Sequence, residues 1–514
     1  MSELEDIGFD SHEYADELGY TDQLGLSDFS DRSVERAQTK EERVRAMTRR
    51  ELLVKGGVAA VAVSSAGALA GAAGAARSKP GAYNGTLTVI TLTVEWSNPA
   101  IQQQAEKDLG VKFNIQAMGT NAQVQKSITA PESFDIGGLY NYQMEPIWPT
   151  GNFQAVDRLK IKAWNDFYPI FTKGRVLVNS KTCTPGQGDA PFRTVFLDLN
   201  GSTHLPPTKE GAAKNKQIVQ WWDEATNKPY QGKPQPRWIL GPPAHFNMDS
   251  MGYNADILQK PANQVSWGEL LNKKWKGRVA LLNDPAIAMI DTGNSVTALG
   301  LMKFKDTGNM TRAEIDRLIK ILIRYKKAGH FRGFWVTFNE SVNLMSSGDV
   351  VIESMWSPAV AALIAQGVNV RYAFPPEGMR GWCSCQAIPK HVTGDKLAAV
   401  YNYFNWMHEG FLGAEIMRQG YYVANGKTLL NWIKGPRGKL GKPPFTAAEY
   451  DFWYNGKPAP RDLPGINGKV GDIKKGQVRD GGSFLSRSCK YTAWNSFFRE
   501  NVYQVKRYND FLSA

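Results

Sequence analysis

Apolar strands that run directly into proline-started helices recur along the chain. The stretch GTLTVITLTVEWS at 85–97 is a β-rich pattern, and Ser-Asn-Pro at 97–99 then supplies a Ser cap and a proline at the first helical turn. The buried-type segment 350–355 ends in Trp-Ser-Pro at 356–358 and enters an Ala-rich helix in the same way. Strands that alternate with helices predict an α/β architecture with largely parallel sheets, in which ligands bind beyond the carboxyl ends of the strands.

Other periodic segments fit the same architecture. VKFNIQAM at 111–118 alternates like a strand, and FDIGGLY at 134–140 has the pattern of a short buried strand. A Thr-x-x-Glu capping box at 311–314 opens a helix. Its apolar positions recur at helical spacing and are predicted to face the core: Ile315, Leu318, Ile319, Leu322 and Tyr325.

Two stretches stand apart from this alternation. Residues 172–240 are rich in Gly, Pro, Lys and Asn, which predicts a loop-rich insertion. Residues 431–514 form a C-terminal extension whose large apolar residues fall at roughly helical spacing, so that it is expected to pack on a domain: Trp494, Phe497, Phe498, Val502, Val505 and Phe511. A chain of 514 residues is long enough for at least two compact units.

The first 76 residues differ in composition from the rest. Residues 1–46 hold 13 Asp and Glu against five Lys and Arg, although the whole chain has a formal net charge of +12, and they are predicted to be an acidic disordered extension. Residues 47–76 place Arg49-Arg50 ahead of a Gly/Ala/Val-rich run that ends in small residues. This pattern predicts a twin-arginine signal peptide and export to the periplasm, and a buried Ala/Gly helix is the alternative.

The distribution of basic residues and the spacing of the cysteines bear on whether the protein binds nucleic acid or a metal ion. The basic residues are scattered without an arginine-rich run, which favours a basic exported protein over one that binds nucleic acid. Cys383 and Cys385 lie near or beyond bridging distance of each other on an extended strand, and the six His have no metal-binding spacing. Packing, or a long-range disulfide such as Cys183 to Cys489, is therefore favoured over a metal or redox role, and no cofactor is expected.

Seven stretches, in this order, resemble the solute-binding proteins of polyamine-type ABC transporters, within the broader extracellular solute-binding family. They are TLTVEWSNP, SFDIGGLYNYQMEPIWPTGNFQAVD, GPPAHFNMDSMGYN, SWGELLNKKWKGRVALLNDP, NLMSSGDVVIESMW, FPPEGMRGWCSCQAIPK and MRQGYYVAN. The resemblance implies a type II periplasmic-binding-protein fold, with two α/β lobes hinged by crossing strands. It places the crossings near 245–254 and 353–357. Lobe 1 is expected to comprise 86–246 and 357–388, and lobe 2 to comprise 250–353 and 389–430.

The resemblance also implies a cleft lined by aromatic rings, whose faces attract ammonium groups. The candidates are Trp96, Tyr140, Tyr142, Trp335, Trp356 and Trp382, and core packing is the alternative for each. Ser97 and Ser357 begin helices whose N-termini favour an anionic group, although a self-capped helix with no ligand explains them equally well.

The carboxylates with which polyamine binders hold amines are absent at their expected positions. Ser384 replaces the Asp of the family's Trp-x-Asp step, and Pro358 follows Trp356-Ser357. Glu95, Glu353 and Glu377 are the candidate substitutes; a hinge hydrogen bond is the alternative for Glu353, and a solvated turn is the alternative for Glu377. These departures predict a small zwitterion or mono-amine rather than a polycation.

The function predicted is that of the substrate-binding component of an ABC importer, which captures a small polar organic solute and delivers it to the membrane permease. A monomer exported by the twin-arginine machinery is expected. The sequence contains none of the common nucleophile, zinc-hydrolase or nucleotide-loop motifs of enzymes. An exported redox enzyme and a ferric-ion binder that uses Tyr421-Tyr422 remain the alternatives.

Overall fold

The computed structural model describes residues 83–92, 96, 98–172, 183–184, 186–191, 195, 222–223, 228–229, 237–466 and 468–514. The predicted acidic head and signal peptide, at 1–46 and 47–76, lie outside the described residues, as does most of the insertion predicted at 172–240. None of the helices within these ranges is both long and apolar enough to cross a membrane.

The first lobe is built on three parallel strands, β1 (Thr86–Thr91), β2 (Lys112–Ala117) and β3 (Ile136–Tyr140). Helices α4 (Pro99–Leu109) and α5 (Thr120–Thr129) connect them. Asn98, rather than the predicted Ser97, caps α4, because its side-chain oxygen accepts a hydrogen bond from the backbone N–H of Ala100 at 3.0 Å. Ser97 itself lies outside the described residues.

The second lobe repeats the arrangement with parallel strands β10 (Val279–Leu282), β11 (Phe331–Trp335) and β12 (Ile352–Met355). Helices α10 (Pro285–Ala298), α11 (Arg312–Lys327) and α12 (Phe338–Ser346) cover them. The capping box of Thr311 and Glu314 is present at the start of α11. Four of the five predicted core positions of this helix are buried, and Tyr325 packs at the edge of the same cluster.

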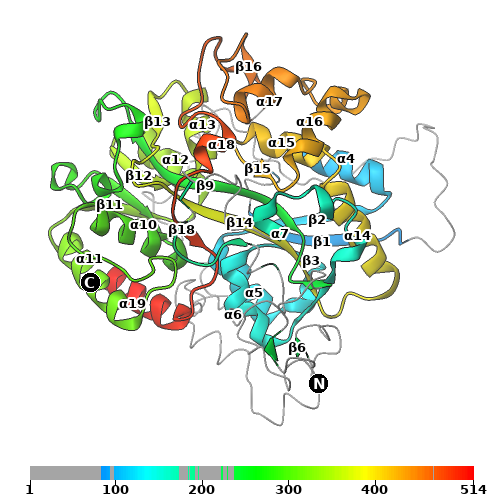
Figure 1. The fold of residues 1–514 in the computed structure, drawn as a ribbon, viewed down its shortest axis with the longest axis horizontal. Coiled ribbons are helices and arrows are strands. Elements are labelled where there is room, and N and C mark those ends of the chain that lie inside the picture. Colours follow the sequence, from blue (N-terminus) through cyan, green and yellow to red (C-terminus); the bar gives the residue numbers. More distant parts are fainter. Residues whose placement is uncertain are drawn as a thin grey trace, which may run out of the picture. The chain divides into compact units, whose positions relative to one another are not determined.

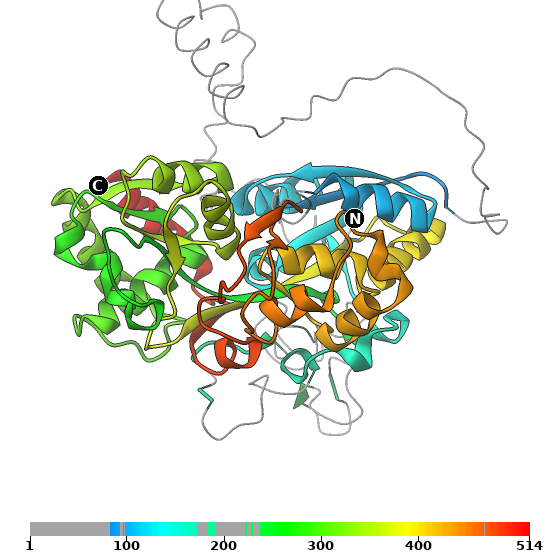
Figure 2. The same ribbon diagram turned by 90° about the horizontal axis from the view of Figure 1, so that it is seen from above.

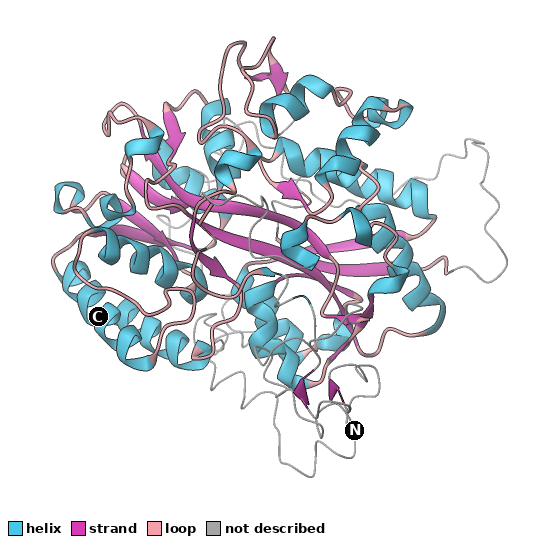
Figure 3. Cartoon of the chain, in the orientation of Figure 1, coloured by secondary structure: helices cyan, strands magenta, loops and turns pink. Residues whose placement is uncertain are grey.

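Two long strands cross from one lobe to the other. β9 (Pro243–Asn254) and β14 (Met379–Pro389) pair antiparallel, with Arg380 opposite Asp249, and join both sheets into one sheet of order β11-β10-β12-β9-β14-β3-β1-β2. Figure 2 shows the two lobes on either side of these strands, and Figure 3 shows helices on both sides of the sheet. The predicted two-lobe α/β fold with crossing strands is thus confirmed.

The position of the second crossing corrects the predicted lobe boundaries. Residues 353–357 end β12 and begin α13 (Ser357–Ala365), and β13 (Val370–Tyr372) pairs with the second-lobe end of β9. Helix α14 (Gly394–Met407) packs on α4 of the first lobe. Most of 357–388 and 389–430 therefore exchange lobes relative to the prediction, because the chain crosses along β14 and not at 353–357.

The C-terminal extension contacts both lobes (Figure 1). Strand β18 (Tyr491–Asn495) pairs with the start of β14, and α19 (Asn501–Ser513) packs on α10 and α11. Between the first lobe and β18 the chain forms α15 (Phe411–Arg418), β15 (Tyr422–Val423), α16 (Gly426–Lys434), α17 (Ala447–Trp453), β16 (Leu463–Pro464), β17 (Val470–Ile473) and α18 (Phe484–Arg487). A disulfide joins Cys183 to Cys489.

Short elements complete the first lobe and the described parts of the insertion. They are α6 (Met144–Ile147), β4 (Phe153–Gln154), β5 (Val156–Asp157), α7 (Pro169–Thr172), β6 (Trp222–Asp223), β7 (Lys228–Pro229) and β8 (Trp238–Ile239).

Candidate ligand-binding site

A small cavity lies where the two lobes meet the crossing strands. The first lobe contributes the ends of β1 and β3 and the start of α5, and the second lobe contributes α10 and the residue before α13. Both crossing strands and the turn before β15 complete the walls. The lining residues are Leu92, Thr120, Tyr140, Tyr142, Asp249, Ile287, Trp356, Arg380, Trp382 and Tyr421.

Aromatic rings in this lining contact one another. The Trp382 ring lies edge-on to Tyr140, with centroids 5.2 Å apart, and edge-on to Tyr421, with centroids 5.1 Å apart. Tyr140 in turn stacks on Tyr142 at 5.7 Å. The rings support one another and together form one aromatic wall of the cavity.

Charged groups lie at one end of the cavity. The Trp382 indole N–H donates to Asp249 Oδ2 at 2.5 Å, and the Arg380 guanidinium lies 3.9 Å from the same oxygen. Arg380 Nε donates to Asp291 Oδ1 at 2.7 Å, and Ser354 donates to the other oxygen of Asp291 at 2.6 Å. Two carboxylates thus share one guanidinium.

Burial governs the protonation of these carboxylates. It raises the pKa of Asp249 to about 6, against the opposing effects of Arg380 and the Trp382 N–H. Burial likewise raises the pKa of Asp291. Above about pH 6 Asp249 is largely ionised, so the cavity wall carries a carboxylate beside the Arg380 guanidinium.

One carboxylate bridges the lobes across the cavity. Asp284, which precedes α10, accepts hydrogen bonds at Oδ2 from Thr120 Oγ1 at 2.6 Å and from the Tyr142 hydroxyl at 3.2 Å. Its Oδ1 caps α10 by accepting from the N–H of Ala286 at 2.9 Å. These contacts join the two lobes in this structure.

Comparison with known proteins gives the family. The family described as bacterial extracellular solute-binding protein matches residues 99–411. The chain belongs to this family. No curated protein matches the chain in a sequence comparison.

Solved structures show similarity at low sequence identity. A putative spermidine/putrescine ABC transporter from Listeria monocytogenes is 15% identical, with 71% of this chain and 89% of that chain covered and a TM-score of 0.45. An ABC transporter substrate-binding protein from Bradyrhizobium japonicum is 16% identical, with coverage of 71% and 92% and a TM-score of 0.43.

Four of the predicted ligand residues of this extracellular solute-binding protein share the cavity: Tyr140, Tyr142, Trp356 and Trp382. Two more lie directly behind its walls. The Trp335 ring meets Trp356 edge-on at 4.9 Å and donates its N–H to the Ser354 carbonyl at 3.1 Å. Ser384 is buried and hydrogen bonds to His245 Nδ1 at 2.9 Å. Both act on the cavity only through the residues in front of them.

Two further candidates, Trp96 and Glu377, lie away from the cavity in this structure. Trp96 lies outside the lining, because it packs against Phe113 and Tyr403 at 5.9 and 6.3 Å between ring centroids. Glu377 accepts hydrogen bonds from Ser266 Oγ and from the N–H of Trp267 at the surface. Both side chains serve local packing or capping in the described structure.

The remaining candidates also lie away from the cavity. Glu353 is fully buried in β12, and burial raises its pKa well above the ordinary value. Ser357 is the first residue of α13 rather than its cap; it accepts from Asn247 Nδ2 at 2.9 Å and lines a different pocket.

The sequence did not identify Thr120, Asp249 or Arg380 as cavity residues, and it indicated Tyr421 only as a ferric-ion ligand. Asp249 and Arg380 carry a usable signal, since each is a charged residue inside an otherwise uncharged strand that is buried along almost its whole length. Charges of this kind are rare in a buried strand without a partner. The partner became visible only with the pairing of β9 and β14.

The two cysteines of β14 are free and buried. Burial raises the pKa of both thiols, that of Cys385 to about 12, so they pack as protonated groups. Among the described residues no group of three or more His, Cys, Asp or Glu is placed to hold a metal ion. The adjacent tyrosines have separate environments: Tyr421 lines the cavity, whereas the Tyr422 hydroxyl accepts from Arg479 at 2.6 Å.

Proposed function

We propose that this solute-binding protein captures a small mono-amine or zwitterion in the cavity between its lobes and delivers it to the membrane permease of an ABC importer. The observation that carries the proposal is the Asp249 carboxylate beside a wall of aromatic rings. An ammonium group placed there gains about 0.5 to 2 kcal/mol from each ring face that it contacts, in addition to its attraction to the carboxylate.

The charge and size of the cavity support a ligand of this class. Arg380 lines the same cavity, but Asp249 and Asp291 already share its guanidinium, so the ammonium group of the ligand is the group that we expect this site to hold. The cavity is small in this structure, which favours a short solute over an extended polyamine. Closure around the solute completes the Asp284 contacts, since the ligand and these hydrogen bonds both stabilise the closed state.

A thermal-shift and calorimetric screen tests the proposal. Ethanolamine, β-alanine, glycine betaine and spermidine are titrated into the mature chain, and a bound ligand at 100 times its Kd adds about 2.7 kcal/mol to stability. Asp249→Asn is expected to weaken binding of the best amine by ten- to a hundredfold. Asp349→Asn is the matched control, because this carboxylate forms a half-exposed ion pair with Arg332 on the second lobe.

Two outcomes contradict the proposal. Spermidine binding more tightly than every mono-amine and zwitterion would show that the cavity opens for a polycation. Equal affinities for the two Asn variants would show that the amine does not bind at Asp249.

The route to the transporter is also part of the proposal. We propose export of the monomer to the periplasm through the twin-arginine pathway, supported by the arginine pair at 49–50 and the small residues near 75–76. Arg49→Lys with Arg50→Lys should leave the unprocessed chain in the cytoplasm, as judged by fractionation and immunoblotting. Normal secretion of this variant would contradict the twin-arginine route.

A further inference from the structure

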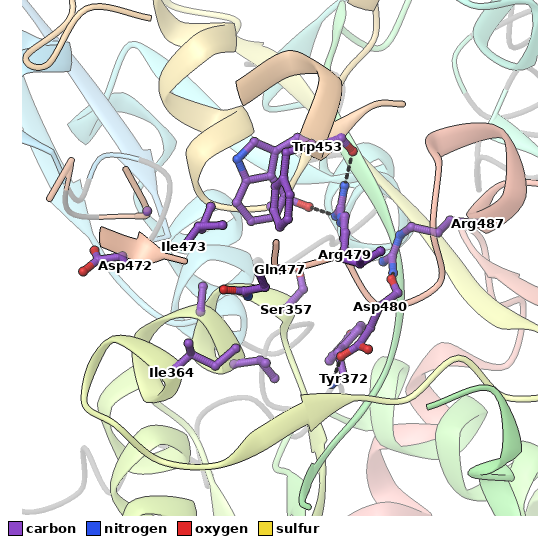
Figure 4. A pocket seen from close by; sticks show the side chains of 16 residues that line it. Ser357, Ile364, Tyr372, Trp453, Asp472, Ile473, Gln477, Arg479, Asp480 and Arg487 are labelled. Atoms are coloured by element: carbon purple, nitrogen blue, oxygen red, sulfur yellow. Dashed lines mark hydrogen bonds between the residues drawn. The ribbon is translucent and has the colours of Figure 1, made fainter. Parts of the chain in front are cut away.

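A second pocket lies beneath the C-terminal extension. One wall is the face of α13, and the other consists of α17, β17 and the segment 477–487 of the extension. Figure 4 shows the side chains that face it. Most of these residues follow residue 411, where the match to the solute-binding family ends. The pocket is therefore largely a product of the extension.

Two guanidinium groups lie in this lining. Arg479 and Arg487 are 8% and 1% exposed, and no carboxylate among the described residues is within ion-pair distance of either. Burial and the neighbouring Arg487 charge lower the pKa of Arg479 to about 10. Two buried cations without a counterion are unfavourable, unless an anion enters the pocket.

The hydrogen bonds of these groups leave capacity for an anion. Arg479 donates to the Tyr422 hydroxyl, the Trp453 carbonyl and the Gly420 carbonyl at 2.5–2.6 Å, all neutral acceptors. Arg487 donates to the carbonyls of Asp480 and Met248 at 2.9 and 3.1 Å, and its buried Nε has no partner.

The carboxylates in the lining do not neutralise these cations. Asp480 is paired with Arg371 and also accepts from the N–H of Tyr372 at 3.1 Å. Asp472 lies at the other end of the pocket from Arg487 (Figure 4). The cationic end of the pocket therefore keeps its charge.

The rest of the pocket is apolar. Trp453 and Phe452 of α17 face Val360 and Ile364 of α13 across it. The first turn of α13 also borders the pocket through Ser357, and no side chain caps that helix. A cationic end beside apolar walls suits a molecule that has an anionic group and a hydrophobic body.

We propose that this pocket is a second ligand site, which binds a small organic carboxylate with an aromatic or branched apolar body. The carboxylate lies against Arg479 and Arg487, and the body packs between Trp453 and α13. The site is distinct from the cleft. The two are close, because Trp356 and Tyr421 line the cleft whereas their neighbours Ser357 and Gly420 line the second pocket.

Three probes test the chemistry by calorimetry and tryptophan fluorescence with the mature chain. Phenylacetate carries both features, 2-phenylethanol lacks the charge, and acetate lacks the body. Phenylacetate is expected to bind one per chain, at least tenfold more tightly than either of the others. Equal binding of phenylacetate and 2-phenylethanol, or no binding of phenylacetate at millimolar concentration, overturns the proposal.

Two variants locate the probe. Arg479→Met should weaken phenylacetate at least tenfold, whereas the surface control Arg332→Met should not. Ala361→Phe fills the pocket from α13 without removing any of the arginine hydrogen bonds, and should abolish binding while the chain stays folded. Undiminished binding to Ala361→Phe overturns the proposal. A loss with Asp249→Asn as large as that with Arg479→Met also overturns it, because the probe would then occupy the cleft.

Discussion

The two pockets of this protein have opposite charge. At the cleft, two buried carboxylates, Asp249 and Asp291, share the single guanidinium of Arg380. In the pocket beneath the extension, Arg479 and Arg487 have only neutral hydrogen-bond acceptors. We therefore propose a cationic group as the ligand of the cleft and an anionic group as the ligand of the second pocket.

The difference follows the construction of the chain. The cleft lies at the crossing of β9 and β14. Its lining residues fall within the 99–411 match to the family, except Leu92 and Tyr421. The second pocket depends on the extension, whose disulfide to Cys183 and parallel pairing with β14 fix it to the rest of the molecule. An added segment has thus created a second chemical environment beside the first.

Removal of one arginine from each pocket gives the largest expected contrast. Arg380→Met leaves two buried carboxylates without a counterion and should lower the free energy of unfolding by about 3 to 5 kcal/mol. Arg479→Met leaves only neutral oxygens without a donor, which should lower the free energy of unfolding by about 1 to 3 kcal/mol. Removal of the unpaired buried charge offsets part of this loss. Urea denaturation at pH 7.5 measures both. Equal losses would show that Arg479 has a buried counterion.

The pH dependence of stability should distinguish the cleft carboxylate. The folded-state pKa of Asp249, about 6, is above its ordinary value of 3.8, so protonation favours the folded state. Its contribution is present below about pH 4 and is lost as pH rises through 6, a change of about 3 kcal/mol. Urea denaturation from pH 4.5 to 7.5 measures the free energy of unfolding of wild type and of Asp249→Asn. The contributions of the other titratable groups cancel in the difference between the two. A constant difference across this range would contradict the raised pKa.

Local signals made much of the fold predictable. The capping box of Thr311 and Glu314, and the alternation of strands with proline-started helices, act over a few residues and are readable in the sequence. The lobe boundaries were not predictable in this way. They depend on the strand that crosses between lobes, and the pairing of Arg380 with Asp249 across β9 and β14 joins residues 131 positions apart.

The candidate site was likewise predictable only in part. Trp356 and Trp382 were predictable because aromatic residues at strand ends, in a known order of motifs, indicate a cleft. Trp96 follows the same local pattern, yet its ring packs on Phe113 and Tyr403. A local motif specifies where the backbone turns, whereas tertiary packing decides which way the ring faces.

A smaller effect is expected from the contact that bridges the lobes. Thr120→Val removes a donor to the buried Asp284 carboxylate and should cost about 2 kcal/mol of stability. The open state should also become more populated, with a larger radius of gyration by solution scattering. Thr129→Val, at the other end of α5, is the control, because its hydroxyl bonds only within the helix, to the Gln125 carbonyl. If both variants scatter alike, Asp284 does not control closure.

The smallest effect is expected at Glu377, which the sequence indicates as an amine ligand and the structure places in a turn. If Glu377 held the amine of the solute, Glu377→Gln would lower the affinity for the solute about tenfold or more. In the structure its carboxylate instead accepts from Ser266 and Trp267 at a surface turn, outside the cleft lining. Glu377→Gln keeps an acceptor there and should cost less than about 1 kcal/mol of stability, with unchanged solute affinity. Ser266→Ala removes the donor of the same hydrogen bond and serves as the control. Similar small losses of stability in both variants would identify a turn contact. A fall in solute affinity in Glu377→Gln alone would show that Glu377 contacts the ligand.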